Sequence, residues 1–164
     1  MKTLCLIRHA KSSWNDEYVE DFERLLNQRG LNDAPEMGKR LMQFGFRPDL
    51  IMSSPAFRAM STARRISREL AYDTQQIVAD SRIYDASLHR LIDLVQGLPD
   101  EAQVVAMVGH NPGMQHLAQY LTGLAPDEFP TCAVFAIRFD LTAWSAITPL
   151  CGKLLFYDFP KSSE

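Results

Sequence analysis

The stretch CLIRHAKSSWN, residues 5–15, contains a strand that ends on an arginine and a histidine. Residues 4–7 form a continuous apolar run, which is typical of a strand covered on both faces of a parallel sheet. Arg8 and His9 follow this run directly. Because ligands bind beyond the carboxyl ends of the strands in such sheets, this stretch predicts both the type of fold and the edge at which a site lies.

The rest of the chain alternates between further strands and helices. Apolar runs predict strands at 49–53, 75–80 and 103–108, and each is followed by apolar residues at helical spacing. The last third has two β-rich segments, 133–139 and 154–159, without a helical pattern between them, which indicates antiparallel strands. The pattern predicts an α/β fold, a three-layer sandwich with a mostly parallel central sheet flanked by helices.

Polar residues next to prolines mark the expected helix starts. DAPE, residues 33–36, has the capping-box spacing with proline in the first turn, and it predicts a helix over 33–45. SP at 54–55 and NP at 111–112 have the order of an N-cap followed by proline at the first helical position.

Composition favours one domain without nucleic-acid or membrane partners. The 164 residues suffice for one core, so we expect a single domain over 1–160 with a polar tail at 161–164. The 17 basic and 20 acidic residues are intermixed, which argues against nucleic-acid binding. No segment has the features of a signal peptide or the ~20 apolar residues of a membrane span. We therefore expect a cytoplasmic protein, whose free buried thiols are Cys5, Cys132 and Cys151.

Basic side chains stand at the ends of three expected strands. Arg8 and His9 follow the first strand, and Arg58 lies in the first turn of the helix after the second. His110 follows the strand at 103–108. Since like charges repel, their convergence at one sheet edge requires an anion, for which helix N-termini supply further N–H donors. The sequence therefore predicts a site for phosphate or a similar oxyanion.

The motifs at these junctions resemble those of the histidine phosphatase superfamily, a group that includes cofactor-dependent phosphoglycerate mutases and many phosphatases. The motifs are RHAKSSWN (8–15), SSPAFRAMSTA (53–63) and VGHNPG (108–113). The short chain, together with DFERLLNQRG (21–30) and IYDAS (83–87), is most similar to the small SixA-like phosphohistidine phosphatases. The resemblance covers residues 4 to about 124 and implies a phosphoglycerate-mutase-like fold that works without a metal or a cofactor.

The resemblance implies a role for each motif residue. His9 matches the nucleophilic histidine that becomes phosphorylated, and His110 matches the second histidine of the pocket. Arg8 and Arg58 match the two arginines that hold the phosphoryl oxygens. Asp85 lies nearest the position where larger members carry a general-acid glutamate, and its alternative interpretation is a solvated carboxylate in a turn.

Further residues of the motifs are candidates for binding substrate. Asn15 falls where mutases place an asparagine that contacts phosphate, and Ser12 is a second candidate. Arg24 either reaches the pocket or pairs with the acidic loop 15–23, which itself either folds over the site or repels acidic substrates. Ala10 replaces the usual glycine, so either this turn does not need a positive φ or the loop is shifted.

The resemblance implies phosphohistidine in a protein as the leading substrate, with inorganic phosphate as product. Its partners would be phosphorelay or phosphotransferase carrier proteins. An imidazole leaving group, with an unperturbed pKa near ~6.5, needs less help from an acid than an alkoxide does. One alternative is a phosphatase or mutase for small metabolites, although a chain of 164 residues leaves little for a lid. A second is a non-catalytic phosphate-binding module, which would have no need of the nucleophile His9.

Overall fold

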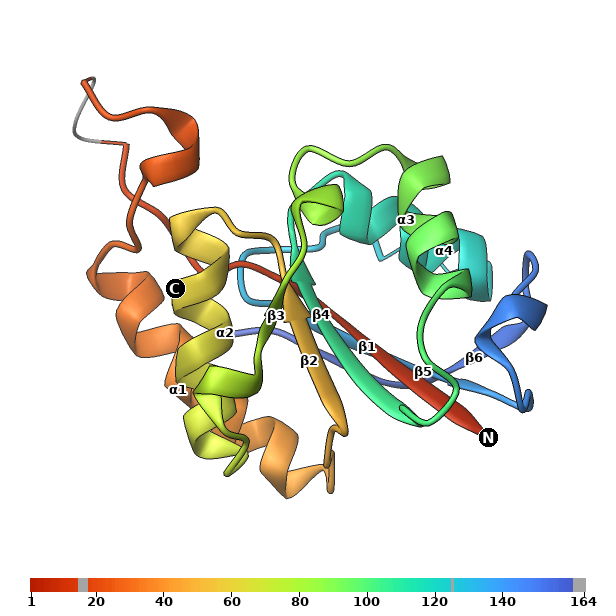
Figure 1. The fold of residues 1–164 in the computed structure, drawn as a ribbon. Coiled ribbons are helices and arrows are strands. Elements are labelled where there is room, and N and C mark those ends of the chain that lie inside the picture. Colours follow the sequence, from red (N-terminus) through yellow and green to blue (C-terminus); the bar gives the residue numbers. More distant parts are fainter. Residues whose placement is uncertain (15–17, 125, 161–164) are drawn as a thin grey trace.

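A six-stranded mixed sheet forms the centre of the computed structural model, which describes residues 1–14, 18–124 and 126–160 (Figure 1). Its order is β3-β2-β4-β1-β5-β6. Strands β3, β2, β4 and β1 are parallel, whereas β5 is antiparallel to both β1 and β6. The expected mostly parallel sheet with antiparallel C-terminal strands is therefore confirmed. The strands are β1 (Lys2–Arg8), β2 (Leu50–Ser53), β3 (Val78–Ala79), β4 (Val104–Gly109), β5 (Val134–Phe139) and β6 (Gly152–Asp158).

Helices cover both faces of the sheet (Figure 1). One face carries α1 (Gln28–Gln43) and α2 (Phe57–Glu69), and the other carries α3 (Leu88–Gln96) and α4 (Gly113–Thr122). The three layers predicted from the sequence are thus present. Within the described residues, no helix has the length and apolarity required to cross a membrane.

The central strands contribute to both layers of the core. Leu4 and Leu6 of β1 pack in the cluster with α3 and α4, while Cys5 and Ile7 pack in the cluster with α1 and α2. Side chains of a strand alternate between faces, so a strand buried on both faces has no polar position. This explains the unbroken apolar run, and the thiol of Cys5 is buried and free, as expected.

The register of the sheet aligns the carboxyl ends of β1, β2 and β4 at the same edge. Arg8 at the end of β1 pairs with Gly109 of β4, and Ser53 at the end of β2 pairs with Val108. The backbone N–H of His9 continues the ladder by donating to Gly109 O at 2.9 Å. The residues that follow β1, β2 and β4 therefore share one edge of the sheet.

Helix α1 begins earlier than the sequence indicated. It starts at Gln28, with Asn27 as N-cap accepting a hydrogen bond from the N–H of Gly30 at 2.9 Å, and it ends at Gln43. The predicted start at 33 was wrong: Pro35 lies inside the helix, and Asp33 pairs with Arg29 instead of capping. A proline and an acidic residue mimic a helix start locally, but the packing of the preceding turn decided the real one.

The other two predicted starts are also displaced. Helix α2 begins at Phe57 because Ser54 Oγ accepts from the N–H of Ala56 at 3.2 Å, within the turn before the helix. Helix α4 begins at Gly113, one residue after a cis Asn111–Pro112 peptide bond. Asn111 still binds the first turn of α4, because its Oδ1 accepts from the N–H of Gln115 at 3.3 Å, although the N-cap position itself is Pro112.

Close backbone packing in the first layer depends on Gly30 rather than on a glycine at position 10. Ala10 is fully buried and is not among the residues with positive φ, so the turn after β1 does not need glycine. A Cβ atom on Gly30 would instead lie 2.2 Å from the carbonyl oxygen of Lys11. The start of α1 thus packs directly on the backbone that follows His9.

We predict that Gly30→Ala lowers the free energy of unfolding by about 1–3 kcal/mol, the usual range for overpacking. Helix propensity alone predicts the opposite sign, because alanine favours an α-helix over glycine. Urea denaturation measures the change. Gly97→Ala is the control, since its Cβ would meet Asp93 O at an ordinary 3.4 Å. A Gly30→Ala protein as stable as the parent would contradict the packing argument.

Candidate active site

The imidazole of His9 is buried just beyond β1 in a defined orientation. Its Nδ1 lies 2.7 Å from Ala10 O, a carbonyl that can only accept, so we assign the proton to Nδ1. Nε2 then carries the lone pair, and the Nε–H of Arg58 donates toward it at 3.4 Å. This tautomer presents a nucleophilic nitrogen towards a guanidinium group.

The surroundings of His9 keep it neutral. Burial lowers the pKa of His9 to about 3, while the hydrogen bond to Ala10 O acts in the opposite direction. Electrostatic interactions with His110, Arg58 and Arg8 act in the same direction as burial and contribute to this low pKa. The lone pair on Nε2 is therefore available at any pH well above this value.

His110 faces His9 from the end of β4, with the two ring centroids 5.2 Å apart. Its Nε2 is 2.8 Å from Ser54 Oγ, whereas its buried Nδ1 has no hydrogen-bond partner among the described residues. Burial, and then the charge of Arg58, lower the pKa of His110 to about 4. The site therefore holds two neutral imidazoles, and one nitrogen of His110 can bind a ligand atom.

Arg58 is buried in the first turn of α2 and is held at several points. Its Nη1 donates to Asp21 O at 2.6 Å, and its Nη2 donates to Asp21 Oδ2 at 3.1 Å. Thr62, one turn along the helix, donates from Oγ1 to Arg58 O at 2.8 Å and accepts from the N–H of Ala10 at 3.0 Å. Thr62 thereby joins α2 to the turn that orients His9.

Arg8 is the last residue of β1, and its side chain is partly buried. Its Nη1 donates to Phe129 O at 3.0 Å, and Asn111 Nδ2 donates to the same oxygen at 3.0 Å. Its Nε is buried without a hydrogen-bond partner in the described part of the chain. Burial lowers the pKa of Arg8, but an arginine remains charged at neutral pH, and that charge acts on both His9 and His110.

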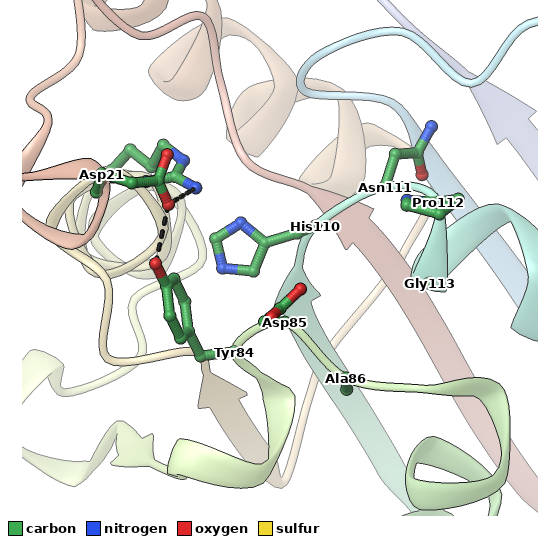
Figure 2. A pocket seen from close by; sticks show the side chains of 9 residues that line it. Asp21, Tyr84, Asp85, Ala86, His110, Asn111, Pro112 and Gly113 are labelled. Atoms are coloured by element: carbon green, nitrogen blue, oxygen red, sulfur yellow. Dashed lines mark hydrogen bonds and ion pairs between the residues drawn. The ribbon is translucent and has the colours of Figure 1, made fainter.

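The sequence did not single out Asp21 and Tyr84 as site residues, yet both lie in the site. Asp21 Oδ2 accepts from the hydroxyl of Tyr84 at 2.7 Å, beside the ring of His110 (Figure 2). Burial raises the pKa of Asp21, but hydrogen bonds from Tyr84 and Arg58 outweigh it and lower the pKa to about 2. The described end of the acidic loop therefore folds onto the site.

A cavity of about 250 Å³ opens beside His110 and Arg58, smaller than the 300–1,000 Å³ typical of sites for drug-sized ligands. His9 and Arg8 are not among its lining residues. The volume suits a phosphoryl group with a short leaving group. No group of three His, Cys, Asp or Glu side chains in the described residues could hold a metal ion. The cavity is lined by Asp21, Arg58, Tyr84, Asp85, Ala86, His110, Asn111, Pro112 and Gly113 (Figure 2).

Of the remaining candidates from the sequence, Asp85 lines the cavity, whereas Ser12 and Arg24 contact each other and Arg24 contacts Asp21. Asp85 lines the cavity, in the left-handed backbone region with φ of 51°. Ser12 and Arg24 do not line it: the Nη1 of Arg24 donates to Ser12 Oγ at 2.6 Å, and its Nε and Nη2 contact Asp21 Oδ1 at 3.2 and 3.1 Å. Asn15 lies outside the described residues.

The sequence analysis did not name Asp21, Tyr84 or Thr62 as site residues, and of these three Asp21 has a signal in the local sequence. Asp21 and Arg24 stand three residues apart, a spacing that brings their side chains together in the 3₁₀ turn Asp21–Glu23. That spacing is a usable local signal. Tyr84 and Thr62 have no such signal, because the atoms they bind come from distant parts of the chain.

Comparisons with known proteins identify the family of the chain and structures of similar fold. Residues 4–89 match the sequence profile of the histidine phosphatase superfamily (branch 1). The fold is similar to the crystal structure of a proposed phosphohistidine phosphatase SixA from Agrobacterium tumefaciens, with TM-score 0.83, 28% identity and coverage of 97% of this chain and 98% of that one. It is also similar to the protein histidine phosphatase SixA complexed with tungstate, with TM-score 0.82, 18% identity and coverage of 96% of both chains.

An uncharacterized chloroplastic protein of Arabidopsis thaliana is similar in sequence. It is 26% identical over 160 residues, which cover 92% of this chain and 72% of the plant protein. The similarity therefore extends across nearly the whole chain, beyond the segment that the family profile matches.

We expect the His9 imidazole to show no titration between about pH 5 and 8, because burial lowers its pKa to about 3. The neutral form is stable above this pKa and is lost only as the pH falls through it. Long-range ¹⁵N–¹H NMR measures both the titration and the Nδ1–H tautomer, and His9→Asn assigns the signal. A short histidine peptide is the reference, and a His9 midpoint near about 6.5 would contradict the expectation.

Proposed function

The chain belongs to the histidine phosphatase superfamily, and on this premise we propose that it is a metal-independent phosphatase that works through a phosphohistidine intermediate on His9. The observation that carries the proposal is the orientation of this imidazole. Nδ1–H is held by Ala10 O, and the free Nε2 is directed at the guanidinium of Arg58. A phosphoryl group bound by Arg58 is thereby offered a nitrogen lone pair.

In the first step, Nε2 of His9 attacks phosphorus in line with the leaving group. The Nε2–P bond forms while the bond from phosphorus to the leaving atom breaks, and the leaving group takes up a proton. Guanidinium groups of Arg58 and Arg8 stabilise the charge on the equatorial oxygens. We assign to His110, whose ring centroid lies 5.2 Å from that of His9, the role of binding one of these oxygens.

In the second step, water attacks the phosphorus of phosphohistidine. The Nε2–P bond breaks, inorganic phosphate leaves, and His9 regains its lone pair. Asp85 lines the cavity and is the candidate to give a proton to the leaving group and to accept one from water. The arginines supply the positive charge that metal ions provide in other phosphoryl-transfer enzymes.

The favoured substrate is phosphohistidine in a protein such as a phosphorelay or phosphotransferase carrier. An alkoxide leaving group needs a positioned general acid, and the candidate Asp85 is a solvent-exposed residue on the cavity lining. This limits monoesters, which leave as alkoxides, more than phosphohistidine, whose imidazole is a better leaving group. The similarity to the Agrobacterium SixA, at 28% identity, supports the same substrate class.

We predict fast phosphate release from a phosphohistidine-bearing carrier domain and weak turnover of sugar phosphates, phosphoglycerates and an aryl phosphate. His9→Ala should abolish release from every substrate, because the nucleophile is lost. Each reaction is followed by release of inorganic phosphate, with and without EDTA. EDTA should have no effect, since the positive charge comes from arginine side chains.

Two experimental outcomes would contradict the proposed phosphohistidine phosphatase activity and favour another function. Strong monoester turnover with an intact phosphocarrier would indicate a small-metabolite phosphatase or mutase and would make Asp85 a genuine general acid. Phosphate binding without turnover of any substrate would indicate a non-catalytic binding module.

We predict that Arg58→Ala lowers kcat about 10²–10³-fold, as the loss of an oxyanion-stabilising donor does in other enzymes. Arg64→Ala is a matched control, because Arg64 lies on the same helix with its side chain in solvent. Single-turnover phosphate release measures both variants, and circular dichroism verifies that they are folded. Equal rates for the two variants would rule out the role assigned to Arg58.

A further inference from the structure

The carboxylate of Asp21 occupies the cavity although the proposed reaction does not use it. We propose that Asp21 is a specificity-determining residue that disfavours leaving groups carrying a carboxylate or a second phosphate near the scissile bond. Neutral or cationic leaving groups, such as imidazole, are admitted. The inference rests on the proposed function, because it concerns the leaving group in the same cavity.

Asp21 is fixed in position by groups from three segments. Tyr84 donates to Oδ2 from the loop that follows β3, and Arg58 donates to Oδ2 and to the main-chain oxygen from α2. Arg24 contacts Oδ1 from the end of the same turn. The charge of Asp21 is therefore held at one place in the cavity and does not move freely into solvent.

The described lining of the cavity carries more carboxylates than cations. Of the described residues that line it, Arg58 is the one cation, whereas Asp21 and Asp85 are both carboxylates. Arg8 is not on this lining, and its Nη1 donates to Phe129 O. The guanidinium of Arg24 is bound to Asp21 and Ser12 and lies 3.5 Å from the centre of the Trp14 ring. Once a phosphoryl group binds Arg58, a second anionic group has no other cation to pair with among the described lining residues.

A bound phosphoryl group must also lie close to Asp21. The Nη2 of Arg58 donates to Asp21 Oδ2, and Nε of the same guanidinium faces the nucleophilic nitrogen of His9. A further anion on the substrate would experience repulsion from Asp21, weakened by solvent because the Asp21 side chain is 51% exposed. With its pKa lowered to about 2, Asp21 stays ionised at neutral pH, so protonation does not relieve this repulsion.

Asp21→Asn separates this role from a merely positional one. The asparagine side chain keeps an oxygen that can accept from Tyr84 and Arg58, and the main-chain oxygen that binds Arg58 remains. The substitution removes the negative charge and the second oxygen, Oδ1, which Arg24 contacts. Glu23→Gln is the matched control, because Glu23 is an exposed acid of the same turn that does not line the cavity.

The test uses binding of glycerol 3-phosphate and 3-phosphoglycerate, which differ by a carboxylate in the leaving group. Calorimetry at neutral pH gives the ratio of the two dissociation constants for the parent protein and both variants. We expect the parent to prefer glycerol 3-phosphate, and Asp21→Asn to reduce this preference about tenfold through tighter binding of 3-phosphoglycerate. Glu23→Gln should leave the ratio unchanged.

Three results would overturn the inference: equal or absent binding of the two ligands in the parent protein, an unchanged ratio in Asp21→Asn, or an equal shift in Glu23→Gln. Equal weakening of both ligands in Asp21→Asn would show that Asp21 only positions Arg58. Dephosphorylation of a phosphohistidine carrier is measured separately on the parent protein. Its failure would reject the proposed function, whereas the ligand ratio would still report on the charge selectivity of the cavity.

Discussion

The burial of a neutral imidazole among guanidinium groups is the constraint on which the rest of the site depends. Burial and neighbouring positive charge both lower the pKa of His9, so the ring keeps the lone pair that a nucleophile needs. The same burial demands that its other nitrogen have an acceptor, which Ala10 O supplies. Thr62 then binds the N–H of Ala10, so the orientation of the ring depends on the position of α2.

Asp21 is the counter-ion of two guanidinium groups at the site. Asp21 lies between the guanidiniums of Arg58 and Arg24, and the hydroxyl of Tyr84 binds the same carboxylate. Two arginines near two buried imidazoles would repel one another without such a counter-ion. The acidic turn is therefore part of the site, and its charge limits which further anions the site accepts.

The elements of the fold were largely predictable, but their ends were not. The apolar runs of β1, β2 and β4 and the helical spacing of α2, α3 and α4 determine which segments are strands and helices. The start of α1 was predicted too late, because DAPE mimics an N-terminus while the true N-cap is Asn27. A cap is a local hydrogen bond, and the choice between competing caps depends on packing such as that of Gly30 against Lys11.

For the site, the sequence by itself determined which residues stand at strand ends, Arg8, His9 and His110, and that Arg58 lies in the first turn of the helix after β2. Parallel pairing requires those ends to meet at one edge, and the register of β1, β2 and β4 brings them there. Only the tertiary structure decided that Asp21 and Tyr84 line the cavity with Arg58 and His110, whereas Ser12 and Arg24 do not line it. The reason is physical: the position of a strand along the chain follows from the local hydrophobic pattern, whereas a counter-ion depends on which charges the folded chain brings within hydrogen-bonding distance.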